Sequence, residues 1–281
     1  KNERSMLPNS QQITNDTTIR TLNNPPAARL IFIIAAVSFL VYFNALFNGF
    51  VYDDYAQIVD NQGLRDLGNL PRIFIEDVWS FMGGGPSNYY RPLMHAMYML
   101  NYALFGMRPW GFHLVNILLH AGVSILVFLT SCKLFAISRL QTSRLLLSFV
   151  AALLFATHPI HTEAVTWVAC LPELSFTLLY LWALYAYMGA VQGEHLVSRS
   201  QYSLSLLFFV LAALFKETAL TLPLMLAVYD YSSARESYRP FRYLKRYLPF
   251  LTAAVLYLAM RSYVLSGFAP LKRHSELSAY E

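Results

Sequence analysis

Charged residues are scarce in this chain. Asp, Glu, Lys and Arg make up 13% of its 281 residues, whereas about a quarter of a typical soluble domain is charged. Hydrophobic residues make up 56%, and the mean hydropathy is +0.41. Several apolar stretches approach the ~20 residues that a helix needs to cross a bilayer. These values exclude a soluble domain and predict an all-α polytopic membrane protein.

Cysteine and the common cofactor motifs are scarce as well. The chain has two cysteines, and Cys132 and Cys170 are expected at opposite ends of their predicted spans, so we expect no disulfide between them. The sequence contains no zinc-type cysteine spacing, no glycine-rich nucleotide-binding fingerprint and no internal repeat. We therefore expect neither a structural zinc nor a nucleic-acid partner.

Hydropathy predicts about seven membrane spans. Their ranges are 30–48, 110–132, 145–157, 172–190, 203–215, 218–231 and 247–265. Residues 1–29 are polar and are expected to form a cytoplasmic N-terminal tail, and residues 30–265 are expected to form the transmembrane module. Because the chain begins at Lys1 rather than Met, we expect its true start to be missing. The C-terminal segment 266–281 is also expected to be truncated.

The distribution of charge predicts the orientation in the membrane. The linkers 133–144 and 230–246 carry Lys and Arg, whereas the segment 49–91 carries more Asp and Glu than Arg. By the positive-inside rule, the basic linkers are cytoplasmic and the acidic segment lies outside. The range 49–109 is then the first extracytoplasmic loop. We expect it to carry two interfacial helices, over residues 67–82 and over residues 92–105, with a flexible turn at 83–86 between them.

Ionisable residues from four connections gather at the predicted outer face. They are Asp53 and Asp54 after the first span, Arg91 and His113 before the second, His158, His161 and Glu163 after the third, and Lys216 and Glu217 between the fifth and sixth. Such residues near a membrane are costly and usually line a site or a pathway. A transporter is disfavoured because the charges lie at one face and no inverted repeat is visible.

The residues of this face admit a functional and a structural interpretation. In the functional interpretation, Asp53 or Asp54 acts as a general base on an acceptor hydroxyl, while its neighbour orients the substrate or binds a cation. In the structural interpretation, both are solvated loop charges that cap the next helix. Arg91 can hold a phosphate bidentately or snorkel toward lipid headgroups.

The motifs at 158–163 and 216–218 also allow both a functional and a structural interpretation. His158 and His161 can bind a metal or neutralise a phosphate, or they can bond the loop backbone, and their spacing is not the zinc-protease signature. Lys216 can point at an anionic headgroup, or Lys216 and Glu217 can neutralise each other in a tight turn. Together the set suits a lipid phosphate leaving group, which needs stabilisation of charge more than it needs protonation.

The order of these motifs resembles a known family. Val-Tyr-Asp-Asp at 51–54, Tyr-Arg-Pro-Leu at 90–93, the segment 111–116 with His120, His-Pro-Ile-His-Thr-Glu-Ala-Val at 158–165 and Lys-Glu-Thr at 216–218 occur in that order. They are similar to the membrane half of the TMTC-type proteins, which are transmembrane and tetratricopeptide-repeat O-mannosyltransferases, and of their bacterial relatives. These proteins belong to the GT-C superfamily of glycosyltransferases. The resemblance covers roughly residues 40–231.

The resemblance implies a GT-C-like module of about seven transmembrane helices with a long first extracytoplasmic loop. It implies an inverting glycosyltransferase that moves a sugar from a polyprenyl- or dolichyl-phosphate carrier to an extracytoplasmic hydroxyl. The residue roles it implies are catalytic for Asp53 or Asp54, donor-phosphate-binding for Arg91, His158, His161 and Lys216, and supporting for Glu163, Glu217 and His113. Whether a divalent cation binds at Asp53 or Asp54 is left open by the resemblance.

The implied partners are membrane lipid, the lipid-linked sugar donor, and a protein acceptor or a larger membrane complex. The implied location is a bacterial inner membrane rather than the endoplasmic reticulum, with the catalytic face extracytoplasmic. The sequence also departs from the family pattern, because Leu171 and Glu173 stand where relatives usually have Arg and Asp, and no tetratricopeptide repeat follows. A non-catalytic GT-C-like accessory subunit of a larger complex is therefore the alternative function.

Overall fold

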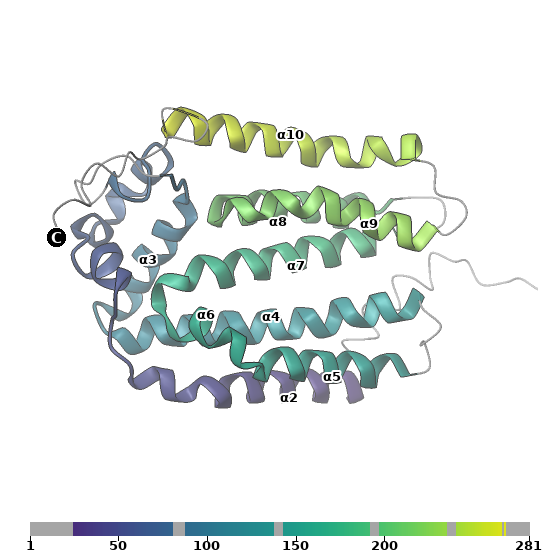
Figure 1. Cartoon of the computed structure of the whole chain (residues 1–281), viewed down its shortest axis with the longest axis horizontal. Coiled ribbons are helices and arrows are strands. Elements are labelled where there is room, and N and C mark those ends of the chain that lie inside the picture. The colour runs from purple at the N-terminus through teal and green to yellow at the C-terminus, as the bar shows by residue number, and fades with distance from the viewer. Residues whose placement is uncertain are drawn as a thin grey trace, which may run out of the picture.

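Helices form every regular element in the part of the chain that the structure describes. The structure is a computed structural model, and it describes residues 25–80, 88–137, 143–191, 197–234, 240–265 and 267. Seven of the helices lie alongside one another as a bundle (Figure 1). They are α2 (Pro25–Tyr42), α4 (Pro109–Ile137), α5 (Arg144–Thr157), α7 (Leu171–Val191), α8 (Arg199–Phe215), α9 (Leu222–Ala234) and α10 (Pro240–Val264). The prediction of an all-α fold is confirmed for these residues.

The bundle is built around α4 and α7, which pack against each other. On one side α4 contacts α5 and α2, and on the other side α7 contacts α8. The helix α10 packs against α8 and α9 and lies at the opposite edge of the bundle from α2 and α5 (Figure 1). Each predicted span overlaps one of these helices, because long apolar runs in the sequence determine where helices form.

By length and composition, the described helices include fewer clear membrane spans than the seven predicted. Four of the described helices are long and apolar enough to cross a membrane, and a fifth span is possible if α5 and the following segment are one span bent by 48°. The helix α8 is apolar but has 17 residues, and α9 has 13. A straight helix of 13 residues reaches about 20 Å, which is short of a ~30 Å hydrocarbon core. An integral membrane protein is therefore supported, whereas the count of seven is not confirmed.

One end of the bundle carries the short elements of the first loop, together with α3 (Pro92–Phe105) (Figure 1). η1 (Phe43–Phe47) follows α2 directly, and the short elements of the loop are η2 (Tyr55–Val59), η3 (Gln62–Arg65), η4 (Leu67–Asn69) and η5 (Arg72–Phe74). The predicted helix over residues 92–105 is confirmed, and it begins at Pro92, which suits the first position of a helix because it lacks an N–H group.

The single helix predicted over residues 67–82 is wrong. The chain forms η4 and η5 there instead, and turns follow. Asp66 accepts a hydrogen bond from the Gly68 N–H at 2.8 Å and so caps η4 alone. Pro71 follows and has no N–H group with which to continue a helix. Residues 81–87, which include the end of that prediction and the turn expected at 83–86, lie outside the described residues.

The loop packs onto the bundle through a buried apolar cluster. The cluster joins the first loop, α3, α4, α7 and the end of α8, and it consists of Ile58, Leu64, Ile73, Val78, Met94, Tyr98, Met99, Phe112, Val168, Leu171 and Phe215. Because these side chains are nearly all inaccessible, burial of apolar surface holds the loop in one position on the helices. The described residues of this loop, 49–80 and 88–91, are thus part of the folded unit.

The opposite end of the bundle is held by a buried carboxylate. Asp230 of α9 accepts hydrogen bonds from the hydroxyl of Tyr187 at 2.6 Å and from the hydroxyl of Tyr247 at 2.7 Å. These three residues belong to α7, α9 and α10, so one carboxylate oxygen ties three helices together. Both cysteines are buried free thiols.

We expect Asp230→Ala to lower the free energy of unfolding by about 2–4 kcal/mol, because two buried tyrosine hydroxyls lose their acceptor. Thermal unfolding of the purified protein in detergent measures this change. Ser232→Ala is the control, because the Ser232 hydroxyl is exposed and only donates to the carbonyl of Val228 in its own helix. An unfolding midpoint for Asp230→Ala equal to that of the control would contradict the assigned role.

Candidate active site

The two adjacent aspartates lie in different environments. Asp54 is completely buried, whereas Asp53 is exposed. One oxygen of Asp54 accepts a hydrogen bond from the Val51 N–H at 2.9 Å, and the other accepts one from the Ala169 N–H at 2.8 Å. Asp54 therefore joins the first loop to the segment that leads into α7. The exposed carboxylate of Asp53 is the one that a ligand can reach.

Burial raises the pKa of the Asp54 carboxyl, because an ionised carboxylate is poorly solvated there. The N–H groups of Val51 and Ala169 act in the opposite direction, and so does the indole of Trp167, while the neighbouring charge of Asp53 adds to the rise. The net shift is upward from 3.8.

Tyr52 precedes the aspartates with a φ of +48°. Positive φ is rare for bulky residues and clusters at functional sites. The ring of Tyr52 lies edge-on to Trp167, with 6.4 Å between ring centroids, and 85% of the residue is exposed. The unusual backbone thus places an aromatic ring beside Trp167 instead of in the core.

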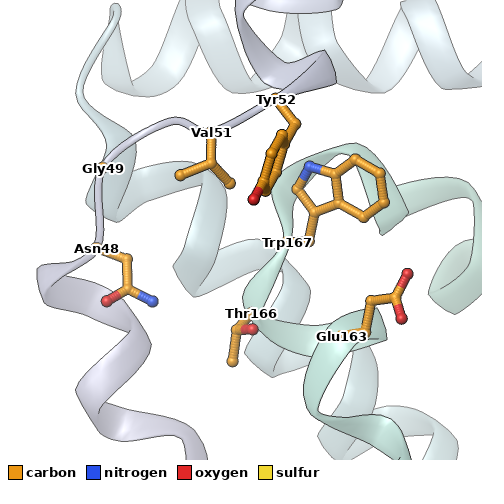
Figure 2. Close-up of a pocket in the computed structure, with 7 residues that line it drawn as sticks. All are labelled: Asn48, Gly49, Val51, Tyr52, Glu163, Thr166 and Trp167. Atoms are coloured by element: carbon orange, nitrogen blue, oxygen red, sulfur yellow. The ribbon is translucent and has the colours of Figure 1, made fainter.

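A cavity of about 560 Å³ opens beside these two rings (Figure 2). It is lined by Asn48, Gly49, Val51, Tyr52, Glu163, Thr166 and Trp167. The first four come from the segment before Asp53, and the last three come from α6 (Thr162–Thr166) and the residue after it. Figure 2 shows the Tyr52 hydroxyl between the two segments, with the Glu163 carboxylate on the side of α6. The predicted supporting residue Glu163 thus lies at a cavity next to the aspartates.

Lys216 and Arg91 each form an ion pair with a carboxylate. Lys216 Nζ lies 2.6 Å from an oxygen of Glu173, and Arg91 contacts both oxygens of Glu217 at 3.1 Å and 3.4 Å. Lys216 and Glu217 are adjacent in sequence, but the self-neutralising pair that they suggested is wrong, because each bonds a residue from another part of the chain. Burial alone would raise the pKa of Glu217, but the hydrogen bond and charge of Arg91 outweigh it and hold that pKa below its usual value.

Tyr98 connects the aspartates with the ion pairs. This fully buried tyrosine of α3 interacts electrostatically with Asp54, Glu173 and Arg91, and its hydroxyl contacts Gln57 at 3.5 Å. Burial, with the charges of Asp54 and Glu173, raises the pKa of Tyr98 well above its usual range. The phenol stays protonated and can donate a hydrogen bond.

The predicted histidines lie on the side of the site formed by α4 and α5. His158 is exposed, and its Nδ1 accepts a hydrogen bond from the Ile160 N–H at 3.2 Å. The ring of His161 lies 6.3 Å from that of His158 and 5.6 Å from that of the buried His120. His113 is fully buried in the first turns of α4. The structure does not bring these histidines into contact with Arg91 or Lys216 among the described residues.

Three residues that line or support this region were missing from the sequence-based set. Glu173 was read as a departure from the family pattern, yet it is the partner of Lys216. Trp167 and Tyr98 carry no charge, and nothing in their spacing separates them from core aromatics. Glu173 could have been found, since it is one of few carboxylates at the predicted outer ends of the helices. No group of three or more His, Cys, Asp or Glu suited to a metal ion forms within the described ranges.

The chain is similar to animal proteins named protein O-mannosyl-transferase. It is 35% identical over 200 residues to human TMTC3, 37% identical over 206 residues to tmtc2 of Xenopus laevis and 38% identical over 203 residues to Tmtc1 of Drosophila melanogaster. Each match covers 70% of this chain and 21% to 23% of the relative. The chain thus spans about a fifth of the length of these relatives. No protein-family model matches it, and no solved structure is significantly similar to it.

The raised pKa of Asp54 predicts a pH dependence of stability. This carboxyl binds a proton more tightly in the folded protein than in the unfolded chain. The contribution of Asp54 to stability is therefore fully present below pH 3.8, and it is lost as the pH rises through the higher pKa of the folded state. We therefore expect the unfolding midpoint of the wild type to fall relative to that of Asp54→Asn as the pH is raised above 3.8. Thermal unfolding at a series of pH values measures it. A pH-independent difference would contradict the shift.

Proposed function

The chain is homologous over 70% of its length to the TMTC protein O-mannosyl-transferases, which are GT-C-type glycosyltransferases, and on this premise we propose that it transfers mannose from a lipid-phosphate carrier to a protein hydroxyl. One observation carries the proposal. A turn with one exposed and one buried aspartate is bound to a segment that has a cavity at one end and a lysine–glutamate pair at the other. That arrangement provides a base, a space for substrate and a cation for a leaving group.

In the proposed reaction, Asp53 is the general base. Its carboxylate takes the proton of the acceptor hydroxyl while the hydroxyl oxygen forms a bond to the anomeric carbon of the sugar. The bond between that carbon and the phosphate oxygen breaks, and its electron pair stays on the lipid phosphate. Attack opposite to the leaving group inverts the anomeric centre. Asp54 acts as a positioning residue, because both of its oxygens already accept backbone N–H groups.

Arg91 and Lys216 stabilise the departing phosphate. Their present ion pairs use only part of their hydrogen-bonding capacity, since a guanidinium has five N–H donors and an ammonium has three. Glu173 and Glu217 hold the two cations in place and keep them neutralised until the anionic donor arrives. The phosphate-binding role of the exposed His158 and the half-buried His161 stays a prediction, because both residues lie on the α5 side of the site rather than beside Lys216.

The proposed carrier is dolichyl phosphate, and the proposed location is the membrane of the endoplasmic reticulum with the site facing the lumen. The relatives named above are animal proteins, so the earlier preference for a bacterial inner membrane is unsupported. A divalent cation at Asp53 remains a proposal. The residues suit it poorly, because both oxygens of Asp54 already accept backbone N–H groups and no group of three metal-ligating side chains forms within the described ranges.

One ground for the accessory-subunit alternative was the change at Leu171 and Glu173. The ion pair between Glu173 and Lys216 weakens it, because the altered position still holds a carboxylate that contacts a cation. Purification in fixed stoichiometry with another membrane protein, without turnover of any lipid-linked sugar, would favour that alternative over transferase activity.

We expect Asp53→Asn to reduce transfer from dolichyl phosphate mannose to a hydroxyl-bearing peptide by about 10²- to 10⁴-fold, because the acceptor loses its base. Unfolding temperature should be unchanged, since Asp53 is exposed. Asp60→Asn is the matched control, because Asp60 is an exposed aspartate of the same loop. Full activity of both Asp53→Asn and Asp54→Asn in a purified assay would refute the assigned chemistry.

We expect the double variant Lys216→Met with Glu173→Gln to reduce kcat/KM for the donor by about 100-fold, because the leaving phosphate loses a preorganised cation. The double variant removes both charges of the pair, so no carboxylate is left unpaired in the fold. Lys245→Met is the control, because Lys245 is an exposed lysine of α10. Kinetics equal to those of the wild type would place the phosphate elsewhere.

A further inference from the structure

The cavity beside Tyr52 and Trp167 is not explained by binding of a lipid phosphate. We propose that it binds the acceptor, as a polypeptide segment whose reactive hydroxyl is flanked by neutral or basic side chains. The inference rests on the proposed transferase function and adds to it the place and charge preference of the acceptor.

The first argument is the order of groups along one segment. Glu163 and Trp167 line the cavity, Ala169 binds Asp54, and Glu173 binds Lys216. The aspartate turn is therefore attached between the cavity and the cation. In a displacement at the anomeric carbon, the acceptor and its base lie opposite to the leaving phosphate. With the phosphate at Lys216, the acceptor belongs on the side of the cavity.

The second argument is charge. Among the described residues, no Lys, Arg or His lines the cavity, and the one carboxylate that lines it belongs to the exposed Glu163. A carboxylate at the rim repels phosphate and acidic peptide side chains, and it attracts lysine and arginine. The donor phosphate is therefore disfavoured here, whereas a neutral or basic polypeptide is favoured.

The third argument is the lining itself. Two aromatic rings meet edge to face at one wall, which offers apolar contact area with few rotatable bonds. The Asn48 amide can donate and accept hydrogen bonds to a peptide backbone. The Thr166 hydroxyl donates to the carbonyl of Thr162 at 2.8 Å and keeps its lone pairs for a donor from the ligand. A volume of about 560 Å³ falls within the range of ligand sites and holds several residues of a peptide.

The strained backbone of Tyr52 supports a binding role. A residue with φ of +48° has to be held by its surroundings, and here the strain directs the ring to the cavity mouth rather than into the core. Tyr52 is also adjacent to Asp53, so a segment held against the ring presents its hydroxyl next to the proposed base.

The test compares two acceptor peptides of equal length, which carry the same Thr flanked either by Lys or by Glu. Purified protein in lipid nanodiscs is supplied with dolichyl phosphate mannose. Two rates are measured separately: transfer of mannose to each peptide, and release of free mannose by hydrolysis when no peptide is present. Glu163→Lys and Glu163→Gln are the variants, and Asp60→Lys is a control charge reversal in the first loop, outside the cavity.

We expect the wild type to prefer the Lys-flanked peptide by about three- to five-fold in kcat/KM, which is the size expected of exposed charge pairs. Glu163→Gln should remove the preference, and Glu163→Lys should reverse it, while Asp60→Lys leaves it unchanged. Hydrolysis of the donor should be the same in all four proteins. Tyr52→Leu should raise KM for both peptides without changing donor hydrolysis.

The other outcomes are equally informative. Variants of Glu163 and Tyr52 that raise KM for dolichyl phosphate mannose and leave peptide KM unchanged would assign the cavity to the sugar of the donor and overturn the proposal. An unchanged peptide preference in Glu163→Lys would overturn it as well. Absence of both hydrolysis and transfer in the wild type would instead refute the proposed transferase function.

Discussion

The hydrogen bond between Asp54 and the Ala169 N–H is the contact on which the site depends. It joins residues 115 positions apart in the chain, and it places the first loop against the segment between α6 and α7. A buried carboxylate without such donors would be strongly destabilising, so the loop and the segment have to stay together for the protein to remain folded. Their relative position then fixes Asp53, the cavity and the approach to Lys216 at once.

Charged side chains at this end of the bundle also depend on partners from distant segments. Two cations at this end of the bundle are each paired with a carboxylate from another helix or loop: Lys216 with Glu173, and Arg91 with Glu217. Pairing lowers the cost of partly desolvated charges, and it also keeps the cations at defined positions. An anionic donor can exchange with these carboxylates, which makes the pairs compatible with a phosphate site that is stable without its ligand.

The resulting site has two chemically different sides. The side near α8 carries two cations that are paired with carboxylates, and it is the proposed side of the leaving phosphate. The side near α6 is aromatic and acidic, and it is the proposed side of the acceptor. Separation of this kind lets a transferase bind an anion and a polypeptide without competition for the same groups.

The sequence by itself determined the helices and the gathering of ionisable motifs at one end of the bundle, because hydropathy and charge asymmetry are local properties of the chain. It also determined the start of α3 at Pro92. Only the tertiary structure decided that Asp54 is buried and Asp53 exposed, that Lys216 bonds Glu173 rather than Glu217, and that residues 67–80 form short 3-10 turns instead of one helix. These outcomes depend on N–H groups, carboxylates and apolar surfaces contributed by distant segments, which the pattern of a single segment does not contain.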